Sequence, residues 1–188
     1  MRRMSLSILA LFIVPLISQS AEAPSADEAS REYFTDLPLV TQHGEEVQFY
    51  TDVLKDQVVL ISFIFTNCPS ACPLITQKMR AARDLLGEEL GADLRLVSIS
   101  IDPERDTPEA MKEFAERQQA DGNWLFLTGA PENINQIVQR LGQYNPDVEM
   151  HSTLLIAGNV NARHWTKIPP MEGPGGVAES LRSLIEPI

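Results

Sequence analysis

Two apolar runs, at residues 58–65 and 94–101, constrain the fold more than any other feature of the sequence. The first run is interrupted by a single serine, which is typical of a strand buried on both faces in the middle of a parallel or mixed sheet. Between the runs, apolar residues recur at spacings of four and three along one stripe of an amphipathic helix, namely Ile75, Met79, Ala82, Leu86 and Leu90. A strand–helix–strand unit of this kind requires a central sheet with helices on its faces.

The other predicted elements complete one α/β domain. They are a hairpin at 37–49 turned at His43 and Gly44, a helix opening at 106–109, a short strand at 124–127, a helix from Pro131 to Gly142, a second hairpin from 153–156 and 163–168 turned at Gly158 and Asn159, and a closing helix at 177–185. A β-α-β half followed by a β-β-α half is a thioredoxin-like arrangement. We therefore expect a three-layer sandwich, with a central mixed sheet, helices on both faces and an extra N-terminal hairpin.

The N-terminus has the pattern of an export signal. Arg2 and Arg3 precede the apolar stretch 6–17, and two triplets of the small-x-small type follow at 18–20 and 21–23. This stretch is shorter than the roughly 20 apolar residues that span a bilayer, so cleavage after Ser20 or Ala23 is expected, with an uncleaved membrane anchor as the alternative. The predicted organisation is a signal peptide at 1–23, a flexible leader at 24–32 and the folded domain at 33–188. The expected location is the periplasm, with tethering to the inner membrane if the signal is retained.

Charge and cysteine content exclude several classes of protein. The chain of 188 residues has a formal net charge of -11, which leaves no electrostatic basis for binding nucleic acid or an anionic lipid surface. Two cysteines are too few for a disulfide-dense scaffold or a cluster held by four thiolates. With this charge and no evident exposed apolar helix, we expect a monomer that touches a membrane only through an uncleaved leader.

The two cysteines, Cys68 and Cys72, lie where chemistry is expected in such a fold. They follow a predicted buried strand and open the long helix. Ligands gather outside the carboxyl ends of strands in α/β sheets. The start of a helix also offers unpaired amides and the positive end of the helix dipole, both of which stabilise a thiolate. We therefore expect both sulfurs to be more acidic than the thiol of free cysteine.

Three interpretations of this pair are open. A structural disulfide would close a very short loop and so would restrict the unfolded chain little. A redox dithiol usually has two residues between its cysteines, whereas three lie between Cys68 and Cys72. A metal site is the third interpretation, because residues four apart share one face of a helix and soft thiolates favour Cu(I) or Zn. Such a site needs another ligand from elsewhere in the chain.

The three histidines are the candidates for that ligand. His43 lies at the predicted hairpin turn and is expected in solvent, and His164 is expected to be half-buried in the last strand. His151 lies just before the predicted strand at 153–156, at a position that faces the cysteines in a thioredoxin-like arrangement. We favour His151 as the third ligand. Met150 is another soft donor, but neighbouring side chains on a strand point to opposite faces, so it is expected in packing.

Four stretches together resemble the Sco/SenC family of copper-binding assembly proteins. They are FIFTNCPSACP at 63–73, SIDPERDTP at 100–108, WLFLTG at 124–129 and His151-Ser152. The resemblance extends over about residues 33–185. Two positions depart from the family pattern: Met150 stands where an acidic residue is usual, and Ala157-Gly158-Asn159-Val160 replaces an Asp-containing turn.

The resemblance implies a thioredoxin-like domain that binds one copper ion, as Cu(I) or Cu(II), through Cys68, Cys72 and His151. It also implies a metallochaperone that delivers copper to the copper A site of cytochrome c oxidase or reduces the cysteines of that site. The implied partners are the copper-binding subunit of the oxidase or another copper chaperone.

Two other functions use the same fold. In a periplasmic thiol–disulfide reductase, Cys68 would attack the partner's disulfide and Cys72 would resolve the mixed disulfide. A peroxide-reducing enzyme would need an arginine beside the thiolate, and the sequence does not place one. Whether the chain is an enzyme is therefore open at this stage. The acidic residues Asp102, Glu104 and Asp106 are interpreted as a solvated loop with a helix cap, and partner docking is the alternative.

Overall fold

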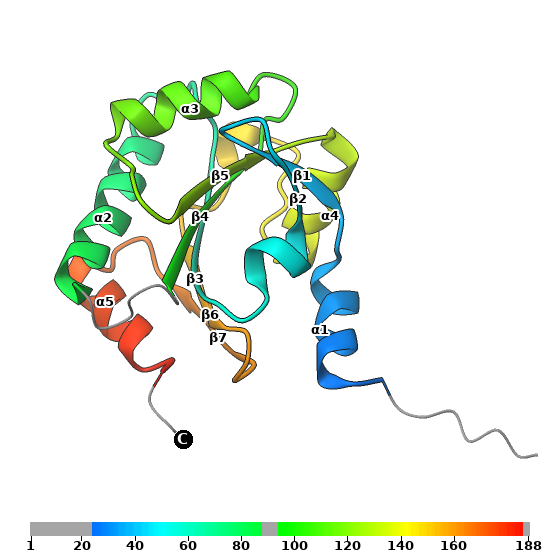
Figure 1. Ribbon diagram of the computed structural model, residues 1–188. Helices are drawn as coiled ribbons and strands as arrows, with labels where there is room; N and C mark the ends of the chain where they lie inside the picture. The colour runs from blue at the N-terminus through cyan, green and yellow to red at the C-terminus, as the bar shows by residue number, and fades with distance from the viewer. Residues whose placement is uncertain (1–23, 88–93, 186–188) are drawn as a thin grey trace, which may run out of the picture.

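A computed structural model describes residues 24–87 and 94–185, which form a seven-stranded mixed sheet between two layers of helices (Figure 1). The elements in chain order are α1 (Ala26–Phe34), β1 (Pro38–Thr41), β2 (Glu46–Gln48), the π-helical turn η1 (Phe49–Leu54), β3 (Val58–Ile64), α2 (Ala71–Leu86), β4 (Leu94–Ser100), α3 (Pro108–Arg117), β5 (Trp124–Thr128), α4 (Pro131–Arg140), the 3-10 turn η3 (Val148–Met150), β6 (Leu155–Asn159), β7 (His164–Ile168) and α5 (Pro174–Arg182). The expected signal peptide at 1–23 and the predicted helical position Leu90 lie outside the described residues.

The sheet has the predicted β-α-β centre. Its strand order is β2-β1-β5-β4-β3-β6-β7. Strands β3, β4 and β5 run parallel, while β6, β7 and the β1–β2 hairpin pair antiparallel at the two sides. Both faces of β3 are buried along its whole length, as the continuous apolar run predicts. The α/β, thioredoxin-like expectation for the fold is therefore confirmed.

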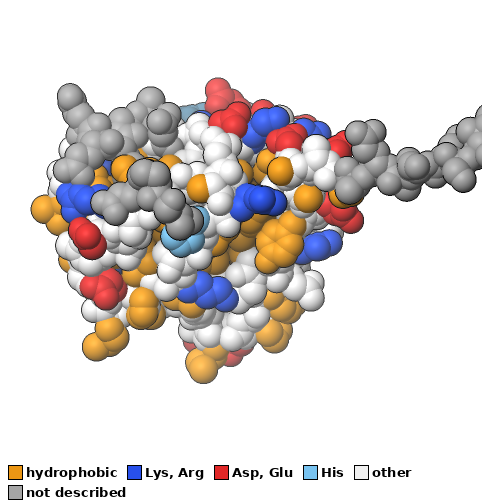
Figure 2. All heavy atoms as spheres, turned by 90° about the horizontal axis from the view of Figure 1, so that it is seen from below, with side chains coloured by type: hydrophobic (Ala, Val, Ile, Leu, Met, Phe, Trp, Pro, Cys, Tyr) orange, Lys and Arg blue, Asp and Glu red, His pale blue; other side chains and the backbone are white. Residues whose placement is uncertain are grey.

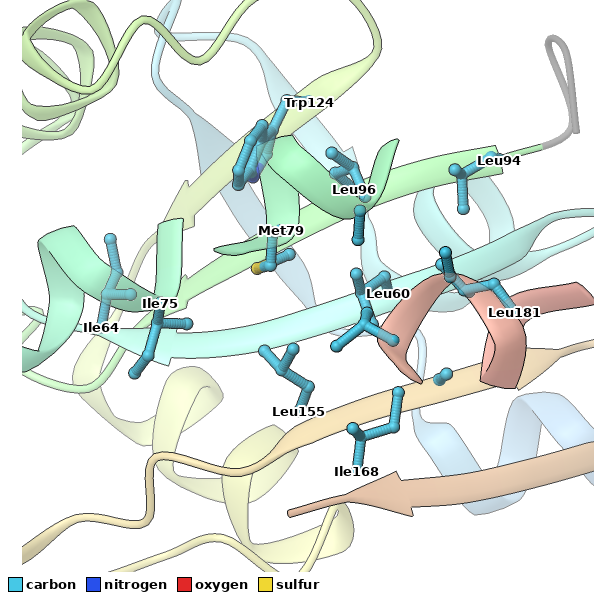
Figure 3. Packing of buried hydrophobic residues seen from close by; sticks show 14 of the residues in the cluster. Leu60, Ile64, Ile75, Met79, Leu94, Leu96, Trp124, Leu155, Ile168 and Leu181 are labelled. Carbon is cyan, nitrogen blue, oxygen red and sulfur yellow. The ribbon is translucent and has the colours of Figure 1, made fainter. Parts of the chain in front are cut away.

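Alternating residues of the central strands belong to two separate hydrophobic cores. Leu60 and Ile64 face the core beneath α2, α3 and α5, which is the cluster drawn in Figure 3. Ile61 and Phe63 face the opposite core, which α1, η1 and α4 cover. This alternation follows from the two-residue repeat of a strand. The sheet is thus covered on both sides, and the ends of the parallel strands are left for loops.

Two of the serines that interrupt the apolar strands are paired with each other. Ser62 and Ser98 lie side by side on β3 and β4, with their hydroxyl oxygens 2.9 Å apart. The indole N–H of Trp124 donates to Ser98 Oγ at 3.0 Å. Burying a hydroxyl without a partner costs free energy, so this buried chain of hydrogen bonds explains how two serines fit within the core.

The structure has a helix where a flexible leader at 24–32 is expected. Helix α1 begins at a capping box in which the Ser25 side chain accepts from the Glu28 amide and the Glu28 carboxylate accepts from the Ser25 amide. The Tyr50 hydroxyl donates to Asp27 at 2.9 Å, and Phe34 is buried beside Trp165. The expectation of an unstructured leader is wrong because the capping box and these tertiary contacts stabilise a short amphipathic helix.

The second hairpin turns later than predicted. Gly158 and Asn159 belong to β6 and pair with Trp165 and His164, so the turn lies at residues 160–163. Gly158 is required by packing, because a Cβ atom there would lie 2.2 Å from the Trp165 ring. The first hairpin turns where predicted, and Gly44 has a φ of 79° that favours glycine. In the described part of the chain, no helix has the length and apolar character needed to cross a membrane.

Candidate functional site

The two cysteines lie in the connection from β3 to α2, at the carboxyl edge of the parallel strands, as predicted. Cys68 precedes the helix and is partly exposed, while Cys72 is the second residue of α2 and is fully buried. Both are free thiols. The Cys72 amide donates to Cys68 Sγ at 3.3 Å, and the Cys68 amide donates to the Phe65 carbonyl at 3.1 Å. The sulfurs therefore approach through a tight turn at the helix start, not through two positions on one helical face.

The two thiols have opposite acidities, which the sequence does not predict. Partial burial raises the pKa of Cys68, but hydrogen bonds from Cys72 and from the amides of Ser70 and Ala71 outweigh this effect and hold the pKa below its ordinary value. Burial raises the pKa of Cys72 to about 12, and its hydrogen bond to Cys68 acts in the same direction. The expectation that both thiols are acidified is confirmed for Cys68 and wrong for Cys72. At Cys72, the desolvation of a buried thiolate outweighs the stabilisation that the start of the helix provides.

A buried aspartate holds the cysteine-bearing connection in place. Asp106 Oδ1 accepts from the amide and the hydroxyl of Thr66 at 3.0 and 2.6 Å, and Oδ2 accepts from the Ser100 hydroxyl at 2.6 Å. Only 1% of Asp106 is exposed, so the interpretation of 102–106 as a solvated loop is wrong for this residue. Asp102 is buried as well and bonds to Arg105, and the cap of α3 is Thr107. Burying a carboxyl group this deeply is costly unless it is hydrogen-bonded, and the three hydrogen bonds that Asp106 accepts meet this need.

His151 follows η3, and only one of its two ring nitrogens meets a hydrogen-bond partner in the described structure. Its Nδ1 lies 2.7 Å from the Val148 carbonyl oxygen. A carbonyl only accepts, so Nδ1 carries a proton, and in the neutral tautomer that this contact selects the lone pair lies on Nε2. This Nε2 atom is buried and has no hydrogen-bond partner among residues 24–87 and 94–185. A backbone carbonyl that fixes the tautomer in this way is typical of a histidine that ligates a metal.

The structure places His151 against the cysteine-bearing segment without completing a three-ligand site. The His151 ring meets the Phe65 ring edge-on, with centroids 5.5 Å apart, and Phe65 lies three residues before Cys68. Among residues 24–87 and 94–185, no three His, Cys, Asp or Glu side chains converge closely enough to hold an ion. The ligand set Cys68, Cys72 and His151 therefore stays a prediction. Its donor types suit a soft cation, and the unpaired Nε2 is available to bind one.

The remaining candidate residues lie elsewhere. His43 is exposed at the first hairpin turn, as expected, and His164 is exposed on β7 instead of half-buried. Met150 is 69% exposed, so the expectation that it packs is wrong. It lies in a 3-10 turn, where the alternation of a strand does not apply. Sequence reasoning missed Phe65 and Asp106 as supports of the site, although Asp106 belongs to the SIDPERDTP stretch that carries the family resemblance.

Comparison with known proteins gives consistent results. The SCO1/SenC family model matches residues 25–186. The SCO1 protein homolog of Bacillus subtilis is 39% identical over 93 residues, which cover 49% of this chain and 48% of that protein. The chain spans about half the length of the curated relatives it matches first.

Solved structures of relatives share the fold. The copper-bound structure of ScoI from Arabidopsis thaliana has a TM-score of 0.69 and 25% identity, and the match covers 79% of this chain and 95% of that one. BsSco, described as a Sco-family cytochrome c oxidase assembly protein with a disulfide switch, has a TM-score of 0.66 and 27% identity, with 79% and 90% covered. The family model covers the whole described domain, including α1 and both cysteines. The chain is therefore a member of the SCO1/SenC family.

Proposed function

We propose that this chain binds one copper ion through Cys68, Cys72 and His151 and takes part in the assembly of cytochrome c oxidase. The observation that carries the proposal is the buried, unpaired Nε2 of His151 beside the segment that bears two free thiols. Thiolates favour Cu(I) or Zn and imidazole suits both metals, whereas Cu(II) would require a further, oxygen-type ligand. Family membership supports the same assignment, because relatives in this family have been solved with copper bound.

Copper is the cargo in this proposal, and the accessible sulfur is the point of transfer. Cys68 is partly exposed, so a ligand of the partner protein can reach the ion there, while buried Cys72 holds it from below. His151 lies in a segment, residues 145–152, whose hydrogen bonds run within the segment itself, apart from one that the Leu154 amide donates to Ser152 Oγ. A movement of this segment toward the thiols would bring Nε2 to the ion without breaking bonds to the sheet.

The proposed setting is the periplasm, after export directed by residues 1–23. The proposed partners are the copper-binding subunit of the oxidase or another copper chaperone, met by a monomer of this chain. Cell fractionation with N-terminal sequencing of the isolated protein tests this setting. Recovery of the full-length chain from the cytoplasm would contradict it.

A second candidate function is thiol–disulfide exchange. It is favoured by the opposite acidities of the two thiols: the exposed Cys68 has a lowered pKa, and the pKa of the buried Cys72 is raised to about 12. Such a pair suits an attacking thiolate and a resolving thiol, since the thiolate is the nucleophile. The family relatives do not favour this function over copper binding.

The experiment that separates the two functions is a Cu(I) titration of the reduced protein under anaerobic conditions, in competition with a chromogenic chelator. We expect stoichiometric binding, and we expect His151→Ala to weaken it by at least about a hundredfold because a direct ligand is lost. His43→Ala is the matched control, since His43 is exposed at a distant turn, and it should bind as the unmodified chain does.

Two results would contradict the proposed copper site. Equal Cu(I) affinity in His151→Ala and His43→Ala would remove His151 from the site. Absence of tight binding, together with rapid reaction of Cys68 with a model disulfide, would replace copper binding by thiol–disulfide exchange. Oxidation of the pair to a disulfide should abolish copper binding, because the ligands are thiolates.

A further inference from the structure

A groove lies on the side of the sheet opposite α2, away from the cysteines. It is bounded by α1, the end of α4 and the β6–β7 hairpin, and it has a volume of about 470 Å³. Its apolar lining comes from the core that α1 and α4 cover, whereas Cys68 and Cys72 belong to the other core. Figure 2 views the molecule from the side of this hairpin and α1, and basic side chains there border exposed hydrophobic ones.

The floor of the groove is aromatic and firmly held. The rings of Phe34 and Trp165 lie with centroids 4.7 Å apart, and Tyr33 meets Phe34 edge-on at 4.8 Å. Trp165 is fixed from behind by Gly158, whose missing side chain leaves room for the indole. Tyr33 is 56% exposed and Phe34 is buried, so the aromatic surface runs from the core to the solvent. Such a surface suits the flat or apolar body of a ligand.

The charged side chains that line the groove all have the same sign. They are Arg140, Arg163 and Lys167, and no acidic side chain lines this groove in the described structure. Lys167 Nζ lies at the end of α4, 3.4 Å from the position a Cβ of Gly142 would occupy. None of the three cations forms an ion pair with a described residue, whereas Arg31, Lys55 and Arg83 pair with aspartates. In a chain with a net charge of -11, three cations without an ion-pair partner among the described residues concentrate positive charge around this groove, although Arg163 also borders a neighbouring pocket lined by Asp27 and Asp56.

We infer that this groove binds an amphipathic organic anion, with an aromatic or apolar body and one carboxylate, sulfonate or phosphate group. The body would lie against Phe34 and Trp165, and the anionic group would lie among Arg140, Arg163 and Lys167. Guanidinium groups bind carboxylate and phosphate oxygens through paired hydrogen bonds and also stack on aromatic faces. The groove volume falls within the range of about 300–1,000 Å³ that is typical of small-molecule sites. This inference does not depend on copper binding.

The test uses 8-anilinonaphthalene-1-sulfonate as an anionic probe and N-phenyl-1-naphthylamine as its uncharged counterpart, with the full chain free of copper. We expect saturable binding of one sulfonate probe per chain and binding of the uncharged probe that is at least tenfold weaker. The double substitution Arg140→Gln and Lys167→Gln should weaken the sulfonate probe at least tenfold and leave the uncharged probe unchanged. Lys112→Gln on α3 is the control for removal of an exposed cation on the other face.

Three results would overturn the inference. Equal binding of the two probes would show a plain apolar surface. Equal binding of the sulfonate probe by the double variant and by Lys112→Gln would show that the cations play no part. Displacement of the probe by a tetraglutamate peptide ending in phenylalanine, at lower concentration than by 1-naphthoate, would assign the groove to an acidic segment of a protein. Thermal melts that match among the variants exclude unfolding as the cause of lost binding.

Discussion

The two segments that carry the proposed copper ligands are anchored in different ways. The connection that bears Cys68 and Cys72 is bonded across 40 residues of sequence, through Thr66 to the buried carboxylate of Asp106. The segment that bears His151 is bonded to itself: Asn145 donates to the Met150 carbonyl, and the His151 amide meets the Val148 carbonyl at 3.4 Å. One half of the proposed site is thus held by a buried carboxylate distant in sequence, and the other half is held mainly by hydrogen bonds within its own segment. We expect the His151 segment to move more readily than the thiol pair, which would suit a protein that must both hold an ion and release it.

The largest effect is expected from removing the anchor of the cysteine-bearing connection. Asp106→Ala deletes the acceptor of three hydrogen bonds and leaves the Thr66 amide without its partner. Leaving three buried or part-buried donors without their acceptor should lower the free energy of unfolding by about 3 kcal/mol, measured by urea denaturation. Glu104→Ala, an exposed change in the same loop, should cost less than about 0.5 kcal/mol. Similar losses in the two variants would show that Asp106 anchors nothing.

The pH dependence of copper binding tests whether Cys72 is a copper ligand. The pKa of Cys72 is raised to about 12, so this thiol is protonated at neutral pH and must lose its proton to bind copper. Because the ion competes with this proton, the apparent Cu(I) affinity should fall as the pH falls. We expect about a tenfold loss per pH unit between pH 8 and 7 from this thiol alone. Competition titrations give the slope, and an indicator dye in weak buffer counts the released protons. A flat profile would mean that Cys72 is not a ligand.

The smallest effect on stability is expected in the segment that carries His151. Asn145→Ala removes a hydrogen bond within the segment and should lower the free energy of unfolding by less than about 1 kcal/mol.

Native-state hydrogen exchange measures the difference in anchoring between the two segments directly. We expect the Thr66 amide to exchange at least about a hundredfold more slowly than the His151 amide. Equal protection of the two amides in the unmodified chain would remove the difference between the segments.

The parts of the fold that follow from short-range patterns were predictable. The continuous apolar run at 58–65 identifies a strand buried on both faces, and the stripe from Ile75 to Leu86 identifies α2. The start of helix α1 was also predictable in principle, since Ser25 and Glu28 have the spacing of a capping box. It was missed because its stability depends on contacts with η1 and β7, such as those of Asp27 with Tyr50 and Phe34 with Trp165, that no local pattern reveals.

The residues of the site were predictable from the sequence, whereas the burial and acidity of their side chains were not. The position of the cysteines after a buried strand follows from the sequence, because carboxyl ends of parallel strands are where ligands gather. The opposite acidities of Cys68 and Cys72 do not follow, since they depend on which sulfur the fold buries. In the same way, Gly158 is of a residue type common in turns. Only its pairing with Trp165, whose ring packs on it, shows that it belongs to a strand.

The borders of the sheet have a consequence for self-association. The two outermost strands, β2 and β7, are only three and five residues long, and each carries a charged residue, Glu46 on one and Lys167 on the other. Short, charged outer strands are poor templates for a strand from another molecule. The long apolar strands that would be most prone to amyloid-like stacking, β3 and β4, are enclosed between neighbours on both sides. The described edges of the sheet therefore disfavour extension of one copy's sheet by the next.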